Sequence, residues 1–492
     1  MPGSPLTGDG PAPEQSLFAN YRYDPRFYDE MFEADAAPRD HCRELWKVLG
    51  GMAPEEIAAM QERAERSFLQ EGITFAVYGE EGAQERIIPI DVLPRIVDAA
   101  TWDFIERGLR QRIRALNLFL ADIYGRGRIL TDGVIPVDMI LGCPQYRIEM
   151  RGVSVPRGIY VALCGTDLVR TVDGFMVLED NLRVPSGVSY MLANRGAMRA
   201  SLNKLFRQYR VRGIEHYGAL LRQTLSELAP RAIADPCIVL LTPGVHNSAF
   251  YEHMFLAREM GVELVQGRDL LVHDGFVYMR TISGLRKVDV IYRRVDDDFL
   301  DPLAFRPDSQ LGVPGLFYAY RLGNVVIANA PGTGVADDKS VYAFVPDIIR
   351  YYLSEEPLLA NVDTHLCRNP EGLEYTLDNL ENLVVKMVGE SGGYGMLVGP
   401  ASTPAERDAY AKEVRKDPAN FISQPVLDLS CAPCLTEKGA APRHVDLRPF
   451  VLTGRETRLV PGAFCRVALV EGSLVVNSSQ GGGGKDLWVL PE

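Results

Sequence analysis

Hydrophobic periodicity predicts helices in the first half of the chain. The clearest helix covers residues 103–124, where apolar residues recur at intervals of three or four and arginines lie off that stripe. The stripe consists of Ile105, Leu109, Ile113, Leu116, Leu120 and Ile123, and the arginines are Arg107, Arg110 and Arg114. Residues 25–72, with a start signal at Ala53-Pro54-Glu55-Glu56, and residues 197–229 are also predicted to be helical. The stripe at 103–124 indicates a scaffold helix that faces a core.

Short apolar runs predict strands in the rest of the chain. Residues 140–190 are strand-rich, and from residue 237 onward the pattern is strand–helix–strand, which is typical of a parallel sheet. The elements of this segment are a strand at 237–242, a helix at 248–260, and strands at 261–265, 288–292 and 324–328. Residues 340–492 mix helices with a strand-rich end. These patterns predict a mixed protein of the α/β and α+β classes.

The composition is typical of a soluble globular protein. Of 492 residues, 47% are hydrophobic and 24% are charged, and this length corresponds to roughly three domains. The net charge of −13 argues against electrostatic nucleic-acid binding, and eight irregularly spaced cysteines indicate no disulfide framework. No apolar run is long enough to span a membrane, and the Pro- and Gly-rich start resembles no signal peptide. We therefore expect a cytoplasmic protein that binds neither membrane nor nucleic acid.

A lysine followed by a glycine-rich loop is the strongest indication of chemistry. The segment Val385-Lys-Met-Val-Gly-Glu-Ser-Gly-Gly-Tyr-Gly-Met396 follows an apolar run and contains Lys386. Its glycines let backbone N–H groups approach phosphate oxygens, and the lysine adds a positive charge. These glycines are Gly389, Gly392, Gly393 and Gly395. The segment is not a Walker A loop, because no Gly-Lys-Ser/Thr follows, and an ordinary hairpin turn is the alternative for the glycines.

A predicted hairpin at 159–181 carries oxygen ligands of the kind that Mg²⁺ uses. Two apolar segments flank the turn Val172-Asp173-Gly174, and Glu179 and Asn181 share one face of the second strand. A three-residue loop with Gly174 in the left-handed conformation puts Asp167 opposite Glu179, which brings two carboxylates and an amide oxygen together. A two-residue Asp-Gly turn puts Asp167 opposite Asp180 instead. A polar hairpin face without metal is the structural alternative.

Together these motifs resemble those of the ATP-grasp ligases. In chain order they are Asp338-Lys339, Lys386 with its loop, Phe421-Ile-Ser-Gln-Pro-Val-Leu427, Asp446-Leu-Arg-Pro-Phe450 and Asn477-Ser-Ser-Gln-Gly481. In linear members the metal-ligand hairpin follows these motifs, whereas here it precedes them. The chain is therefore similar to the circularly permuted type 2 ATP-grasp family, which is distantly similar to the synthetase part of glutathionylspermidine synthase. The resemblance covers about residues 70–492.

The resemblance implies a circularly permuted ATP-grasp fold with an inserted Rossmann-like pre-ATP-grasp domain. It divides the chain into four parts. These are a flexible tail at 1–20, a helical part with the permuted metal-ligand half at 21–235, the Rossmann-like domain at 236–335, and the nucleotide-binding part at 336–492.

The resemblance also implies roles for individual residues. The phosphates of ATP would contact Lys339, Lys386, Gly392, Gly393 and Gly395, and the adenine would contact the hinge residues Gln424 and Leu427. Mg²⁺ would be held by Asp167, Glu179 and Asn181. The acyl phosphate or substrate carboxylate would contact Arg448, Asn477 and Arg183. The structural alternatives are a surface position for Lys339, ion pairs for Arg448 and Arg183, and a turn cap for Asn477.

Family members form an acyl phosphate from a carboxylate and ATP, and an amine then displaces the phosphate. The resemblance thus implies a magnesium-dependent ligase for small-molecule or peptide carboxylates and amines, which releases ADP and phosphate. A phosphotransferase and a non-catalytic nucleotide-binding subunit are the alternatives. The metal ligands and both lysines are present, which argues against the second alternative. The sequence identifies neither the two substrates nor any protein partner.

Three further groups have both a functional and a structural interpretation. Arg293 and Arg294 follow a predicted strand and would either clamp an acidic substrate or pair with the acidic run at 296–298. Lys485-Asp486 follow a glycine run and would close over the site. Cys431 and Cys434 form a lone CxxC pair, which favours a cysteine-bearing loop over a zinc or redox site.

Overall fold

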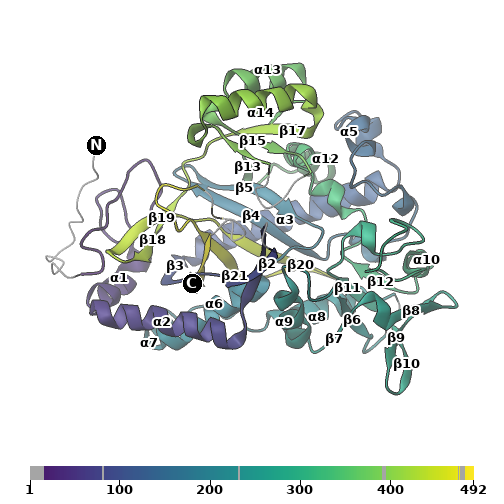
Figure 1. Ribbon diagram of the computed structural model, residues 1–492, viewed down its shortest axis with the longest axis horizontal. Coiled ribbons are helices and arrows are strands. Elements are labelled where there is room, and N and C mark those ends of the chain that lie inside the picture. The colour runs from purple at the N-terminus through teal and green to yellow at the C-terminus, as the bar shows by residue number, and fades with distance from the viewer. Residues whose placement is uncertain (1–15, 80–81, 231–232, 390–394, 475, 477–481) are drawn as a thin grey trace.

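The largest sheet joins strands from distant parts of the chain. The computed structural model describes residues 16–79, 82–230, 233–389, 395–474, 476 and 482–492. Seven strands form this sheet in the order β13 (Ala360–Asn361), β5 (Gly174–Asn181), β4 (Leu163–Thr171), β20 (Arg448–Thr453), β21 (Thr457–Val467), β22 (Gly483–Val489) and β3 (Ile90–Val97) (Figure 1). The pairing of β4 with β20 is antiparallel, with Gly165 opposite Phe450. The hairpin β4–β5 therefore lies directly beside strands from the C-terminal part of the chain.

Helices cover both faces of this sheet. The long helix α3 (Ala99–Ile123) contacts β20 and β21, and α6 (Val188–Ser201) contacts β21, β22 and β3. Alternate strand residues belong to two separate cores: Val451 and Leu487 pack in the core that contains α3, and Leu452 and Trp488 pack in the core that contains α6. Because successive side chains of a strand point to opposite faces, α3 and α6 lie on opposite sides of the sheet.

The helix α3 confirms the periodicity at 103–124. All six residues of the predicted stripe are buried, and Arg107, Arg110 and Arg114 are exposed. The helix begins after Asp98, whose side chain accepts a hydrogen bond from the backbone N–H of Thr101 at 2.7 Å. The predicted helix at 25–72 is only partly correct, since α1 (Arg43–Gly50) and α2 (Pro54–Glu71) follow a stretch of turns and isolated bridges.

A second, parallel sheet confirms the strands expected between 237 and 328. Its order is β12 (Val326–Ala328), β11 (Val290–Arg293), β6 (Ile238–Leu241) and β7 (Glu263–Val265). It is flanked by α8 (Tyr217–Glu227) and α9 (Phe250–Met260). Next to it lies an antiparallel sheet of β10 (Gly284–Val288), β9 (Phe276–Thr281) and β8 (Leu270–His273).

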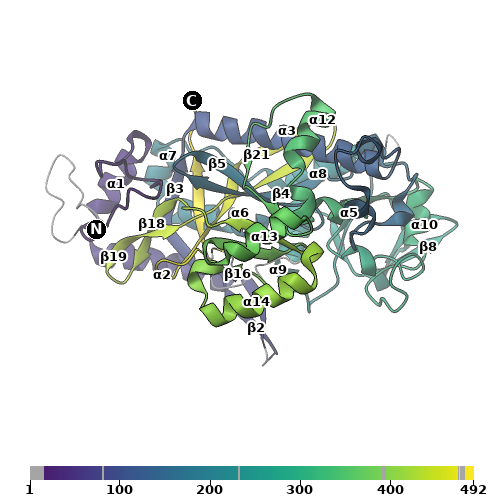
Figure 2. The ribbon, with the colours of Figure 1, turned by 90° about the horizontal axis from the view of Figure 1, so that it is seen from above.

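A third unit, here called the small unit (residues 365–425), has its own core. Its sheet has the order β14 (His365–Leu366), β17 (Phe421–Pro425), β15 (Leu383–Met387) and β16 (Leu397–Val398). Helices α13 (Pro370–Asp378) and α14 (Pro404–Lys416) cover it, and Figure 1 shows the unit above β4 and β5, while Figure 2 looks down on it. Its buried apolar side chains form a cluster separate from the two large cores.

The other elements connect these sheets. They are α4 (Arg128–Thr131), α5 (Val137–Leu141), α7 (Asn203–Gln208), α10 (Leu316–Arg321), α11 (Lys339–Tyr342), α12 (Val345–Leu353) and the hairpins β1–β2 (Thr74–Gly79, Gly82–Ile87) and β18–β19 (Cys431–Thr436, Gly439–His444). Within the described part of the chain, no helix combines the length and apolar character that a membrane span requires.

Candidate functional site

The hairpin β4–β5 pairs Asp167 with Glu179, but a bulge in β5 produces this pairing and the length of the turn does not. Thr171 pairs with Gly174 across a two-residue turn, Val172-Asp173, and Gly174 has a positive φ of 123°. That turn alone would place Leu178 opposite Asp167. The register shifts between Asp167 and Leu168, so that one extra residue on β5 moves Glu179 into position. The expected pairing is therefore correct, whereas the three-residue loop proposed for it is wrong.

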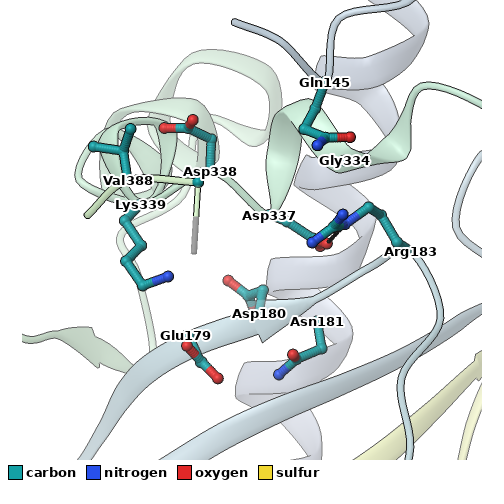
Figure 3. Close-up of a pocket in the computed structure, with 11 residues that line it drawn as sticks. Gln145, Glu179, Asp180, Asn181, Arg183, Gly334, Asp337, Asp338, Lys339 and Val388 are labelled. Atoms are coloured by element: carbon teal, nitrogen blue, oxygen red, sulfur yellow. Dashed lines mark hydrogen bonds and ion pairs between the residues drawn. The ribbon is translucent and has the colours of Figure 1, made fainter. Parts of the chain in front are cut away.

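The two faces of β5 have different partners. Asp180 is buried and accepts hydrogen bonds from Arg112 of α3 at 2.8 Å and from Thr166 at 3.0 Å. Glu179 and Asn181, on the opposite face, line a cavity (Figure 3). Asn181 donates from Nδ2 to the carbonyl oxygen of Gly165 at 3.1 Å, which fixes the orientation of its amide. The hairpin thus presents Glu179 and Asn181 to the cavity, while Asp180, which also borders it, has its carboxylate held by Arg112.

The cavity has a volume of about 30 Å³ and lies between the large sheet and the small unit. It is lined by Gln145, Glu179, Asp180, Asn181, Arg183, Gly334, Asp337, Asp338, Lys339, Val388 and Gly389. Figure 3 shows Lys339 extending from α11 towards Glu179, with Arg183 and Asp337 on the other side. The start of the glycine-rich loop and the hairpin therefore meet at one cavity, as the permuted order of motifs predicts.

Two lysines supply positive charge on the side of the small unit. Lys386 is half-buried in β15 and donates from Nζ to Oε1 of Gln424 at 2.7 Å. Burial, helped by the neighbouring ammonium of Lys339, lowers the pKa of Lys386 to about 8, although the carboxylates of Glu179 and Asp167 oppose the shift. The backbone N–H of Lys339 donates to the carbonyl oxygen of Val388 at 3.3 Å, which joins α11 to the residue that follows β15.

Asp167 does not line the cavity and belongs instead to a buried row of charges. Its Oδ2 accepts hydrogen bonds from Arg448 Nη2 at 2.7 Å and from Arg466 Nη2 at 2.6 Å, and Oδ1 accepts from Arg448 Nε. Arg466 also binds both oxygens of buried Asp446. Burial raises the pKa of Asp167, but the two arginines outweigh burial and hold the pKa well below its usual range. Arg448 Nη2 is also 3.7 Å from Glu179 Oε1.

A second ion pair borders the cavity. Arg183 donates from Nε to Oδ2 of Asp337 at 2.7 Å, and the N–H of Leu182 donates to Oδ1 at 2.5 Å. Burial raises the pKa of Asp337 to about 6 in spite of these donors, and the charge of Glu179 adds to that increase. Gly334 lies against the pair: a Cβ there would be 2.8 Å from Arg183 Cδ and 3.0 Å from Gln145 Cβ. The lack of a side chain at Gly334 therefore makes room for Arg183.

Gly334→Ala is expected to destabilise the protein by about 1–3 kcal/mol, because the added methyl group overpacks against Arg183 and Gln145. Urea unfolding measures the change. The control is Gly196→Ala in α6, where a Cβ meets no atom within 4 Å. This control should be neutral or stabilising by up to about 1 kcal/mol, since alanine favours the helix over glycine. Equal stability of the two variants would show that Gly334 is not sterically required.

Some of the remaining predicted residues lie in the described part of the chain and others lie outside it. Gln424 is buried in β17, where Nε2 donates to Thr364 Oγ1 at 3.0 Å, and Leu427 is half-buried just beyond the strand. Gly395, with a φ of 63°, ends the glycine-rich loop. Asn477, Gly392 and Gly393 lie outside the described residues.

The structure corrects two interpretations of charged residues. Arg293 is fully buried with its Nη2 2.7 Å from Asp297 Oδ1, and buried Arg294 has its Nη2 2.9 Å from Glu252 Oε1. Neither lines the cavity, so the substrate clamp is wrong and the ion pair is correct for Arg293. Lys485 does not close over the site, because it is buried with its Nζ 2.7 Å from Asp91 Oδ1.

The cysteine pair is a structural feature. Cys431 and Cys434 are buried free thiols on β18, and Cys431 Sγ lies 3.4 Å from His444 Nδ1. Along the described ranges, no three His, Cys, Asp or Glu side chains are grouped so that they could hold a metal ion. The predicted loop is wrong in one respect, since both cysteines lie in strand β18.

Sequence reasoning did not identify three residues near the site: Gln145, Asp337 and Arg466. Asp337 directly precedes the Asp338-Lys339 motif, and this acidic neighbour was a usable signal. Arg466 stands between Cys465 and Val467 in an apolar strand, a position that indicates a buried ion pair but not its partner. Gln145 carries no pattern that distinguishes it from a surface residue.

The site has the donor set for a polyphosphate with a hard divalent cation. Lysine ammonium groups bind phosphate oxygens, and carboxylate and amide oxygens are ligands that Mg²⁺ accepts while it keeps several waters. Glu179 and Asn181 face the cavity and fit this role. Asp167 fits by its position opposite Glu179, although in this geometry both of its oxygens are bound by arginines.

Comparison with known proteins gives matches over nearly the whole chain. The family described as circularly permuted ATP-grasp type 2 matches residues 94–468. A protein of Synechocystis sp., named only as uncharacterised, is 52% identical over 471 residues, which cover 95% of this chain and 98% of that protein. A glutathione synthetase-like effector from Globodera pallida, in its apo form, has a TM-score of 0.56 at 11% identity and covers 89% of this chain and 98% of its own. This last likeness concerns the fold alone.

A Frankia alni protein provisionally named glutamate–cysteine ligase 2-3 is 41% identical over 470 residues. These residues cover 95% of this chain but 54% of the Frankia protein. The chain therefore spans about half the length of that relative, and the name describes a longer protein.

Proposed function

Because this chain belongs to the circularly permuted type 2 ATP-grasp family, we propose that it is an ATP-dependent carboxylate–amine ligase. In this proposal a carboxylate attacks the γ-phosphoryl group of ATP, ADP leaves, and an amine displaces phosphate from the acyl phosphate. The observation that carries the proposal is the single cavity at which Glu179, Asn181, Lys339 and the start of the glycine-rich loop meet. The permuted order of motifs requires these elements, which are distant in sequence, to meet at one site.

The lysines are proposed to hold the phosphates. In this proposal Lys386 and the cavity residue Lys339 bring two positive charges to the phosphates, and the glycine-rich loop would supply backbone N–H groups. The hinge residues Gln424 and Leu427 are proposed to contact the adenine. The hydrogen bond from Lys386 to Gln424 supports this, since it links the phosphate side of the site to the hinge.

The proposed metal ligands are Glu179, Asn181 and Asp167, and the ion would be Mg²⁺. When bound, Mg²⁺ would offset the negative charge of the phosphates. The side chains contribute orientation: Asn181 is held by the Gly165 carbonyl, and Asp167 is held by Arg466. Arg448, whose Nη2 is 3.7 Å from Glu179, and Arg183, which lines the cavity, are proposed to stabilise the charge on the transferring phosphoryl group and on the donor carboxylate. Asn477 is proposed to act beside Arg448.

The substrates are proposed to be a small-molecule or peptide carboxylate and an amine. The provisional ligase name of the Frankia relative supports an amino acid as the carboxylate donor. The parallel-sheet region, with residues 236–335 as its proposed bounds, would be the Rossmann-like pre-ATP-grasp domain. Arg294 supports a link between this region and the site, because its Nη1 donates to the carbonyl oxygen of Pro185, two residues beyond Arg183.

The distribution of ¹⁸O tests the reaction class. Donor acids from an amino-acid and short-peptide panel, labelled in the carboxylate, are incubated with ATP, Mg²⁺ and an amine panel. We expect ADP as the nucleotide product, label in inorganic phosphate, and a condensed product detected by mass spectrometry. Label in AMP would overturn the acyl-phosphate mechanism. A stable phosphorylated product without condensation would favour a phosphotransferase.

Nucleotide affinity is expected to fall as pH rises above 8. Only the ammonium form of Lys386 attracts phosphate, and its pKa of about 8 in the free protein means that this form is lost at higher pH. The affinity for a fluorescent ATP analogue should decrease by up to about tenfold per pH unit between pH 8 and 9.5. Lys386→Arg should remove this decrease, because a guanidinium stays charged throughout that range. A wild-type affinity that is constant across this range would exclude Lys386 from phosphate binding.

A further inference from the structure

Asp167 has two guanidinium partners with different surroundings. Arg466 is buried and bridges Asp167 to Asp446, which itself has no exposed surface. Arg448 is half-buried, and its other contacts are weaker: the Ser186 carbonyl oxygen at 3.3 Å and Glu179 at 3.7 Å. Arg466 is therefore fixed by two carboxylates, whereas Arg448 is held mainly by Asp167.

The guanidinium of Arg448 covers the oxygens that a metal would need. Its Nε and Nη2 bind both oxygens of Asp167, and Nη2 also points towards Glu179. Since Glu179 is paired opposite Asp167, the guanidinium lies between the two carboxylates proposed as metal ligands. A divalent cation bound to both carboxylates would meet a positive charge and a competitor for the same lone pairs.

We propose that Arg448 is the cation that Asp167 and Glu179 hold when no divalent metal is bound, and that metal binding displaces its guanidinium from Asp167. The proposal rests on the proposed function, from which the metal site is taken. Asp167 keeps its orientation during the exchange, because Arg466 continues to bind Oδ2. The released guanidinium is then free to contact the phosphoryl group, so that metal loading and the availability of Arg448 are coupled.

The test measures Mn²⁺ binding to the full chain without any substrate. Electron paramagnetic resonance of free Mn²⁺ gives the dissociation constant for wild type, Arg448→Met and Arg448→Lys. We expect Arg448→Met to bind Mn²⁺ about tenfold more tightly, because the bidentate competitor is lost. Arg448→Lys keeps the positive charge but cannot bind both oxygens of Asp167 at once, so its Mn²⁺ affinity should lie between those of wild type and Arg448→Met. Asp167 keeps Arg466 as a partner in both variants, so the fold should be retained, and thermal unfolding checks this.

Two controls make the outcome specific. Arg458→Met removes another half-buried arginine of the same sheet, whose Nη2 lies 3.0 Å from Glu227 Oε1, and it should leave Mn²⁺ affinity unchanged. In an Asp167→Asn background, Arg448→Met should change Mn²⁺ affinity little, because the carboxylate for which Arg448 and Mn²⁺ compete is absent. Unchanged or weaker Mn²⁺ binding by folded Arg448→Met or Arg448→Lys overturns the exchange.

A failure of the proposed metal site can be distinguished from a failure of the Arg448 exchange. Glu179→Gln should weaken Mn²⁺ binding whether or not Arg448 moves, since it removes one proposed ligand. If wild type shows no saturable Mn²⁺ binding that depends on Glu179, the proposed metal site is overturned and the exchange with it. If Glu179→Gln weakens binding but Arg448→Met does not strengthen it, only the exchange is overturned.

Discussion

Lys386→Ala is expected to lower ATP turnover by a factor of about 10²–10³, because it removes a charge from the proposed phosphate site. The loss should not unfold the protein. Lys386 is half-buried, does not line the cavity, and donates its hydrogen bond to a neutral partner, Gln424. ADP release at saturating ATP and Mg²⁺, with the donor and amine panels, measures the effect, and circular dichroism checks the fold.

Lys416→Ala is the matched control, since Lys416 is exposed in the last turn of α14, also in the small unit. It should release ADP at the wild-type rate. Wild-type turnover by Lys386→Ala would remove this lysine from the proposed mechanism, whatever the outcome for the metal site.

Asp167→Ala and Glu179→Gln are expected to separate folding from function. Asp167 is buried against two arginines, and removing one partner from a buried ion pair costs about 3–5 kcal/mol. Glu179 is half-buried and lies 3.7 Å from the guanidinium of Arg448, which is too far for a strong hydrogen bond, so Gln should change stability by less than about 0.5 kcal/mol. Both substitutions should reduce ADP release by about 10²-fold or more, since each removes a proposed metal ligand.

Urea unfolding gives the stability difference, and ADP release gives the functional one. Glu149→Gln, a substitution outside the cavity lining, serves as the control for both measurements. If Asp167→Ala is as stable as wild type, the buried charge row does not contribute to folding. If Glu179→Gln keeps full turnover, Glu179 does not hold the metal.

Helices and strands whose signal lies within a short stretch of neighbouring residues could be predicted from the sequence. The stripe at 103–124 became α3, because an apolar face with a period of 3.6 residues can be buried only as a helix against a core. The strands between 237 and 328 were predicted from another local signal, because short apolar runs bounded by turns are typical of a buried parallel sheet. The hairpin at 159–181 was predicted as well, but the bulge in β5 was not. An inserted residue shifts the phase of a period-2 pattern, and the unbroken apolar run at 175–178 hides that shift.

The sequence could not predict which distant charges pair. Arg448 and Arg466 reach Asp167 from other strands, and nothing local to Asp167 reports them. The same limit explains Arg294, whose acidic neighbours in sequence suggested a local ion pair while the fold supplied Glu252. The resemblance identified the small set of cavity residues, but Gln145 and Asp337 enter the site only through the packing of loops around Gly334.

The pairing of β4 with β20 has a consequence for folding during synthesis. The hairpin β4–β5 leaves the ribosome long before β20, and until then β4 offers an unpaired edge from Leu163 to Gly165. Closing a contact over such a long stretch of chain is slow, so this edge is exposed to pairing with other chains in the meantime. Asp167 is likewise a lone carboxylate during that interval, because both of its arginines belong to strands that are still to be made. A nascent chain that stops before residue 448 therefore carries an aggregation-prone edge and an incomplete site.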